Sequence, residues 1–226
     1  MAAGHGGAID DAHRSIIEVI QPVLAKYGYG LAGGNALRVH GLSTRPTRDV
    51  NMFTSREGAV KPAVPEVEAA LRAAGFDVEF DNRGGHFARD YDDYDAQWLV
   101  TVGDRRIVLH LHVDETFPQP VVISGVGPVH DKEAVLGGKV IALVIRADAR
   151  DFADVFEAME QGWSAEALIA LAWQLNPHDY DADHFTGVLP NLRQLPDFDF
   201  IQYGMSGQQV KRLRDLFERQ WPARLE

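Results

Sequence analysis

Two polar residues with the spacing of a metal-binding pair lie in the segment TRDVNMFT, residues 47–54. Because the side chains of a strand alternate between its two faces, a strand here would present Asp49 and Asn51 on the same face. Two carboxylates in this arrangement could hold a divalent cation over a phosphate. An amide stands at the second position, and an amide oxygen can coordinate a cation but adds no charge. Whether the chain catalyses a reaction depends on this difference.

A glycine pair precedes this strand in the segment YGYGLAGGNALRVHG, residues 27–41. We expect a short strand, a turn at Gly33 and Gly34, and a helix that begins near Asn35, a residue type favoured at helix N-caps. Backbone N–H groups at such a turn attract anions, and glycine lets a phosphate approach the backbone closely. A tight turn without a ligand explains the same pattern.

Basic residues are concentrated around the strand that contains Asp49. Residues 36–61 include five Lys or Arg and two acidic residues, the reverse of the balance in the whole chain. Arg45 and Arg48 therefore suggest a local anion site next to the glycine turn. The alternative is that these arginines pair with carboxylates of an acidic surface.

Two histidines share one face of the strand predicted in RRIVLHLHVD, residues 105–114. Alternation directs the apolar residues one way and His110, His112 and Asp114 the other. Imidazole and carboxylate groups can bind a divalent metal, and histidine can act as a general base near neutral pH. Histidines on the solvated face of a half-buried strand are common, so this pattern alone leaves both readings open.

Charged residues recur through KVIALVIRADARDFADVF, residues 139–156. A helix here would place them on consecutive turns, with Asp151 and Asp154 on a shared face because they are three residues apart. Surface ion pairs, each worth less than about 1 kcal/mol, would explain any one of them but explain their concentration less readily. The residues are Lys139, Arg146, Arg150, Asp151 and Asp154.

Periodicity predicts the elements that position these residues. Helices are expected over residues 9–27 and 62–76, strands over 76–81, 97–103 and 105–114, and a solvated loop over the acidic stretch 89–97. The segment GDR is expected to join the last two strands as a hairpin. From about Asp131 the pattern is helical, so we expect an α/β lobe over 1–130 and a helical lobe over 131–226.

Composition limits the classes of protein to which the chain can belong. Its 226 residues include 22 basic and 33 acidic residues, a net charge of −11, so nucleic-acid contacts would need a local basic face. The absence of cysteine excludes disulfides and thiolate metal sites. With neither a signal pattern nor a long apolar segment, we expect a cytoplasmic protein that does not contact membranes.

Three segments in this order resemble the AbiEii/AbiGii family of nucleotidyltransferase-like proteins. AGGNALRVHG is similar to the family's glycine loop and following helix, RPTRDVNMF to its Asp-x-Asp strand, and RDFADV with an upstream lysine to its helical motif. The resemblance implies an α+β, polymerase-beta-like nucleotidyltransferase fold, a mixed sheet with flanking helices, followed by a C-terminal helical lobe. It also implies a nucleoside triphosphate and Mg²⁺ or Mn²⁺ in the cleft between the lobes. Members that are toxins of type IV toxin–antitoxin systems would have an antitoxin as partner.

The resemblance also suggests roles for individual residues. His110 lies about where the family's third acid is expected, so the implied metal ligands are Asp49, Asn51 and His110. The implied catalytic residues are these three with Lys139 and Asp151. The implied nucleotide-binding residues are Gly33, Gly34, Asn35, Arg48, Arg146 and Asp154. We expect all of them to converge on one anion-binding pocket.

Three hypotheses about function remain open at this stage. The chain could transfer a nucleotidyl group to an acceptor that the sequence does not identify, whether a small molecule, a protein or an RNA. It could be a degenerate nucleotidyltransferase fold that binds a nucleotide or a partner without turnover, because Asn51 and His110 replace two acids and weaken a Mg²⁺ site. It could instead bind a transition metal through His110, His112 and Asp49. Asn51 fits either a natural lineage with altered metal chemistry or an engineered change of an acid to its amide.

Overall fold

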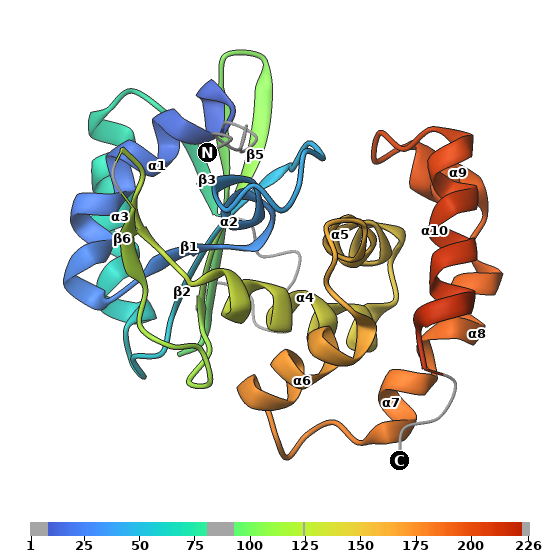
Figure 1. Ribbon diagram of the computed structural model, residues 1–226. Helices are drawn as coiled ribbons and strands as arrows, with labels where there is room; N and C mark the ends of the chain where they lie inside the picture. The colour runs from blue at the N-terminus through green and yellow to red at the C-terminus, as the bar shows by residue number, and fades with distance from the viewer. Residues whose placement is uncertain (1–8, 81–92, 124, 223–226) are drawn as a thin grey trace. The chain divides into compact units, whose positions relative to one another are not determined.

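The computed structural model describes residues 9–80, 93–123 and 125–222 (Figure 1). Contacts among these residues divide the chain into two compact units. The α/β unit comprises residues 9–39 and 47–131, and the helical unit comprises residues 40–46 and 132–222. The short segment 40–46 therefore packs with the helices, although in the sequence it lies between two elements of the α/β unit.

Within the described residues, seven strands form one mixed sheet in the α/β unit, in the order β3-β4-β5-β2-β1-β7-β6. Strand β2 is parallel to β5 and β1 is parallel to β7, whereas the other neighbours are antiparallel. The strands are β1 (Gly30–Ala32), β2 (Asp49–Thr54), β3 (Asp77–Phe80), β4 (Asp95–Val102), β5 (Arg105–Val113), β6 (Val121–Ile123) and β7 (Gly127–Val129). The mixed sheet with flanking helices expected from the sequence is confirmed.

One face of the sheet is apolar and is covered by two helices. Helix α1 (Asp11–Leu24), which continues into a short 3-10 turn η1 (Ala25–Tyr27), packs on helix α3 (Val60–Ala73), and both contact the sheet. Along β2, Val50 and Met52 are fully buried, as are Leu109 and Leu111 along β5. Burial of each such side chain contributes about 1.5 to 3 kcal/mol, so this face fixes the register of the central strands.

The polar residues of the central strands lie on the other face. The parallel register places Asn51 of β2 opposite His110 of β5. The predicted hairpin is present, because β4 and β5 pair up to Val102 and Arg105, with Gly103 at φ 62° in the turn between them.

The expectation of a solvated loop over 89–97 is wrong in part. Asp95 begins β4 and pairs with His112 across the β4–β5 ladder. Residues 89–92 lie outside the described part of the chain. The loop prediction failed because the polar residues of an alternating strand were taken for a charged loop.

The helical unit is built around aromatic and aliphatic side chains. Phe152 contacts Phe217 edge to face, with ring centroids 5.3 Å apart. A Cβ at Gly137 would lie 2.7 Å from the backbone oxygen of Leu171, so glycine is needed where two helices approach closely. The helices are α4 (Lys132–Arg146), α5 (Ala149–Glu160), α6 (Ala165–Leu175), α7 (Ala182–Thr186), α8 (Val188–Gln194), α9 (Asp197–Ile201) and α10 (Gly207–Gln220).

None of the described helices has the length and apolar character needed to cross a membrane.

A continuous helix was expected over the charged segment 139–154, and this expectation is wrong, because the segment forms two helices. Ala147 has φ 48°, a conformation that interrupts the helix between α4 and α5. Asp148 then caps α5, accepting a hydrogen bond from the backbone N–H of Arg150 at 3.0 Å. Lys139 and Asp154 consequently belong to two different helices that pack on each other.

Candidate active site

Gly33 and Gly34 directly follow β1 and form the first turn of helix α2 (Gly33–Val39), against the strand that contains Asp49. Gly33 has φ +62°, and a Cβ there would lie 2.7 Å from the side-chain nitrogen of Asn51. A Cβ on Gly34 would lie 3.0 Å from the hydroxyl oxygen of Thr47. A larger residue at Gly33 would crowd Asn51 of β2, and one at Gly34 would crowd the side chain of Thr47, just before β2. The glycines therefore bring the turn backbone next to Asn51.

Asn35 links this turn to the backbone of Asp49. The prediction that Asn35 caps α2 is wrong, because α2 begins at Gly33 and Asn35 is buried, 1% exposed. Its Nδ2 donates a hydrogen bond to the backbone carbonyl of Asp49 at 2.9 Å. Asn35 therefore fixes the start of β2.

His13 of helix α1 is a buried polar neighbour that the sequence analysis did not select. It is 0% exposed, at a position of the α1 stripe that otherwise buries isoleucine and leucine. Burial lowers the pKa of His13, although the nearby carboxylate of Asp10 acts in the opposite direction. A histidine at the spacing of an apolar stripe was the available signal.

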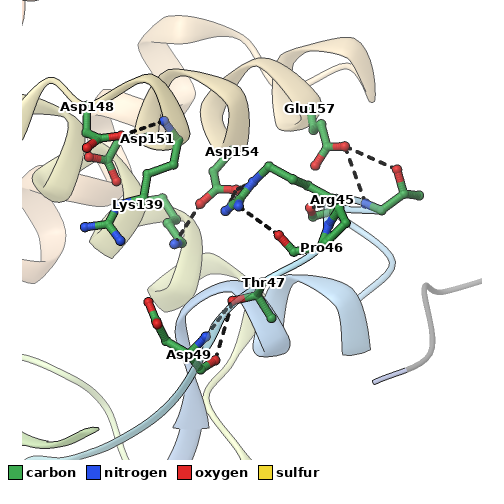
Figure 2. Close-up of polar contacts among 12 residues, drawn as sticks. Arg45, Pro46, Thr47, Asp49, Lys139, Asp148, Asp151, Asp154 and Glu157 are labelled. Atoms are coloured by element: carbon green, nitrogen blue, oxygen red, sulfur yellow. Dashed lines mark hydrogen bonds and ion pairs between the residues drawn. The ribbon is translucent and has the colours of Figure 1, made fainter. Parts of the chain in front are cut away.

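Asp49, Asn51 and His110 lie on the polar face of β2 and β5. Asp49 and Asn51 are two residues apart on β2, and Asn51 is the direct neighbour of His110 across the ladder. All three are half-buried. The hydroxyl of Thr47 lies close to the backbone of Asp49 (Figure 2). The α/β unit therefore brings together the three residues that the resemblance gave as metal ligands.

A second carboxylate, Asp95 of β4, lies between the two histidines of β5. Its Oδ1 is 2.6 Å from Nε2 of His110 and 2.8 Å from Nδ1 of His112. Burial would raise the pKa of Asp95, but hydrogen bonds from both histidines outweigh it and hold that pKa well below its ordinary value. Asp114, considered from the sequence, instead accepts hydrogen bonds from the backbone N–H and the hydroxyl of Thr116.

Asp154 of α5 is the centre of a buried ion-pair group in the helical unit. Its carboxylate is 1% exposed, 2.7 Å from Nζ of Lys139 and 2.7 Å from a guanidinium nitrogen of Arg45 (Figure 2). Burial alone would raise the pKa of Asp154, yet the two cations keep it below its ordinary value. The alternative of exposed surface pairs is therefore wrong for this residue.

Arg146 and Asp151 form a second pair across the break between α4 and α5. Two guanidinium nitrogens lie 3.1 and 2.5 Å from the two carboxylate oxygens, a bidentate geometry. The Asp151 side chain is 0% exposed, whereas 46% of the Arg146 side chain is exposed. The helix break thus places a partly exposed guanidinium on a buried anchor.

The sequence matches the family model described as nucleotidyl transferase AbiEii toxin, type IV toxin–antitoxin system, over residues 29–225. The chain belongs to the AbiEii family. The family resemblance stated from the sequence is therefore confirmed. No curated protein matches the chain.

Solved structures share the fold of this AbiEii-family chain. JHP933 from Helicobacter pylori is similar at 15% identity, with a TM-score of 0.54 over 94% of this chain and 96% of that chain. MenT4, nucleotidyltransferase toxin Rv2826c from Mycobacterium tuberculosis H37Rv, is similar at 15% identity, with a TM-score of 0.57 over 94% of this chain and 86% of that chain. At this identity the likeness shows the fold, which agrees with the nucleotidyltransferase fold expected from the sequence.

The donor set of this AbiEii-family chain does not match a magnesium site. Mg²⁺ prefers oxygen ligands, usually including carboxylates, whereas Asp49, Asn51 and His110 offer one carboxylate, one amide and one imidazole. Only one negative charge is available among the three. We therefore assign no step of a reaction to magnesium at these residues.

The site residues predicted from the sequence are divided between the two units. The α/β unit contains Gly33, Gly34, Asn35, Arg48, Asp49, Asn51 and His110, and the helical unit contains Lys139, Arg146, Asp151 and Asp154. The prediction that both groups share one pocket stays a prediction. Asp95 could not be selected from the sequence, because nothing in the local pattern indicates its pairing with His110, 15 residues later.

Proposed function

We propose that this AbiEii-family chain transfers a nucleotidyl group from a nucleoside triphosphate to an acceptor hydroxyl or phosphate. The observation on which this proposal depends is the close approach of the Gly33–Gly34 turn to strand β2, where Asp49 and Asn51 share a face. Membership of a nucleotidyl transferase family supports it. Because the donor is a nucleoside triphosphate, we place the reaction in the cytoplasm.

Each residue of the α/β unit has a role in this proposal. The backbone at Gly33 and Gly34 approaches the triphosphate, and exposed Arg48 supplies positive charge beside it. Asn35 is a positioning residue, because its amide holds the backbone of Asp49. Asn51 and His110 orient the donor through hydrogen bonds.

The transfer forms one bond and breaks another. The acceptor oxygen forms a bond to the α-phosphorus, and pyrophosphate leaves with the electrons of the bond that breaks. Asp49 is the half-buried carboxylate that takes the proton of an acceptor hydroxyl. Nucleotidyltransferases generally use a divalent metal, which when bound would offset the triphosphate charge.

In the helical unit, two cations are held by buried carboxylates. Lys139 is held by Asp154 and Arg146 by Asp151, and we propose that both cations contact phosphate oxygens. Asp151 and Asp154 then act through their partners, because both are buried. The family's toxin–antitoxin description supports an antitoxin as protein partner.

Pyrophosphate release from each nucleoside triphosphate tests the proposal, measured with Mg²⁺ or Mn²⁺ and a panel of small-molecule, protein and RNA acceptors. We expect turnover that Asp49→Asn lowers by about 100-fold or more. Asp77→Asn, an exposed acid of β3 in the same sheet, is the matched control and should leave turnover unchanged. Absence of turnover in the native chain, together with activity in an Asn51→Asp, His110→Asp double variant, would overturn it.

A second function, nucleotide binding without turnover, is favoured by one specific observation. Two residues that are not carboxylates, Asn51 and His110, lie opposite each other where the resemblance implies carboxylates. Calorimetry with each triphosphate, with and without Mg²⁺, separates the two functions. Tight binding that needs no metal, without pyrophosphate release, would support the binding function.

A further inference from the structure

We propose that Asp95, His110 and His112 bind one divalent transition-metal ion, with Zn²⁺ as the first candidate. Each residue offers one ligand atom, and these atoms lie within 4.8 Å of one another. The proposal requires only the α/β unit and does not depend on nucleotidyl transfer. It differs from the site expected from the sequence, since Asp95 of β4 takes the place of Asp49 as the carboxylate ligand.

The donor set determines which ions this group would select. Two imidazole nitrogens and one carboxylate oxygen suit Zn²⁺ and other borderline transition ions, whereas Mg²⁺ and Ca²⁺ prefer oxygen. Three protein ligands leave a fourth position open for water or a substrate atom, as in catalytic zinc sites.

The distances are compatible with an ion after a small adjustment. The nitrogens lie 2.6 and 2.8 Å from the same oxygen of Asp95. Ligand atoms about 2.0 to 2.1 Å from a tetrahedral ion are separated by about 3.3 Å, so the two contacts must lengthen by about 0.7 and 0.5 Å. Rotation of the partly exposed carboxylate can supply this movement, because 46% of the Asp95 side chain is exposed.

The surrounding strands hold the ligands in place before an ion arrives. Asp95 and His112 are cross-strand partners of the β4–β5 hairpin, and His110 precedes His112 by two residues on the same face of β5. Phe53 of β2 contacts both imidazoles edge on, with ring centroids 6.4 Å from His110 and 5.0 Å from His112. About 30% of each histidine side chain is exposed, which leaves a path for the ion.

Without an ion, the same three residues would form only a hydrogen-bonded group, in which Asp95 accepts from both imidazoles. The two possibilities differ in what they predict. A hydrogen-bonded group binds no stoichiometric metal, whereas a metal site binds one ion, releases protons on binding, and needs all three side chains.

The test is metal titration of the full, untagged chain after chelator treatment. Calorimetry and elemental analysis should give one Zn²⁺ per chain, with Mg²⁺ bound at least 100-fold more weakly. Substitution with Co²⁺ should produce visible absorption bands that excess Zn²⁺ abolishes. Bound Zn²⁺ should also raise the thermal unfolding midpoint, because it binds the folded chain in preference to the unfolded one.

Substitutions of single ligands test whether the bound ion lies at Asp95, His110 and His112. His112→Gln and Asp95→Asn should each weaken Zn²⁺ binding by at least 10-fold and remove the Co²⁺ bands. His184→Gln is the matched control, because His184 pairs with a single carboxylate, Asp181, at 2.6 Å in the helical unit, and it should bind like the native chain.

Two outcomes would overturn the proposal. The first is failure of the native chain to bind Zn²⁺ or Co²⁺ stoichiometrically. The second is unchanged binding in both His112→Gln and Asp95→Asn. Circular dichroism of each variant shows whether it is folded, and Asp95→Glu, which keeps the carboxylate, should retain part of the affinity.

Discussion

The amide of Asn35 donates a hydrogen bond to the backbone carbonyl of Asp49 at 2.9 Å. Through it, helix α2 positions the first residue of the strand on which the proposed chemistry depends. The bond is part-buried, and Asn35, which donates it, is 1% exposed. The same carbonyl accepts a longer hydrogen bond from the Thr47 hydroxyl at 3.4 Å, so Asn35 supplies the shorter of two donors, and its loss costs about 1 to 3 kcal/mol.

We therefore expect Asn35→Ala to lower the free energy of unfolding by about 1 to 3 kcal/mol and to reduce triphosphate binding. Denaturant unfolding and calorimetry measure the two effects. Asn191→Ala, at an exposed position of α8, is the control and should change neither. Unaltered stability of Asn35→Ala would show that the bond contributes nothing.

Gly33 and Gly103 separate the effect of backbone strain from that of crowding. Both have φ +62°, but a Cβ at Gly33 would lie 2.7 Å from Asn51, whereas a Cβ at Gly103 would have nothing within 4 Å. Gly103→Ala should cost about 1 kcal/mol through backbone strain alone. Gly33→Ala should cost about 1 to 3 kcal/mol more, because it also crowds β2. Equal losses of stability in the two variants would contradict the close approach at Gly33.

Asp154 tests the buried ion-pair group of the helical unit. Asp154→Asn removes the charge that faces Lys139 and Arg45, leaving two largely buried cations without their shared counter-charge. We expect a loss of about 3 to 5 kcal/mol in the free energy of unfolding. Glu160→Gln breaks a more exposed pair with Arg212 in the same unit and should cost less than about 1 kcal/mol. A loss as small as that of the control would mean that the cations find other partners.

The buried histidines predict how stability depends on pH. Burial lowers the pKa values of His13 and His130 below the ordinary 6.5, so in acid the unfolded chain binds more protons than the folded chain. Their contribution to stability is complete above pH 6.5 and is lost as the pH falls from there towards their folded pKa values. The urea concentration at the midpoint of unfolding should therefore decrease as the pH is lowered from 8 to 5.

His13→Phe should make this decrease shallower, because it removes one of the two groups. His178→Gln replaces an exposed histidine and should leave the slope unchanged. If the slope of His13→Phe equals that of the native chain, His13 does not titrate differently in the folded and unfolded states.

Local patterns in the sequence were sufficient for much of the fold. Alternation predicted the faces of β2 and β5, including the shared side of Asp49 and Asn51, because the period of a strand is set by its backbone. Two short strands, β6 and β7, were not predicted. With three residues each they are too short to show a period.

Long-range partners could not be predicted from such patterns. The positive φ of Ala147, which ends α4, has no local signal, since alanine is a strong helix former. The contact between Arg45 and Asp154 joins residues 109 positions apart, and the burial of Asp154 depends on it. The sequence shows that Arg45 and Asp154 are charged, but their spacing does not show that they pair with each other.

The segment 40–46 has a consequence for how the protein can be divided. Its Arg45 and Leu42 bond to Asp154 and Gln161 of the helical unit, yet it is synthesised before most of the sheet. A cut between residues 131 and 132 would therefore not yield two self-sufficient fragments: the carboxy-terminal piece would lack the arginine that neutralises Asp154. Expression of the helices alone should give an insoluble or unfolded product, and adding a peptide that spans residues 40–46 should restore part of its structure.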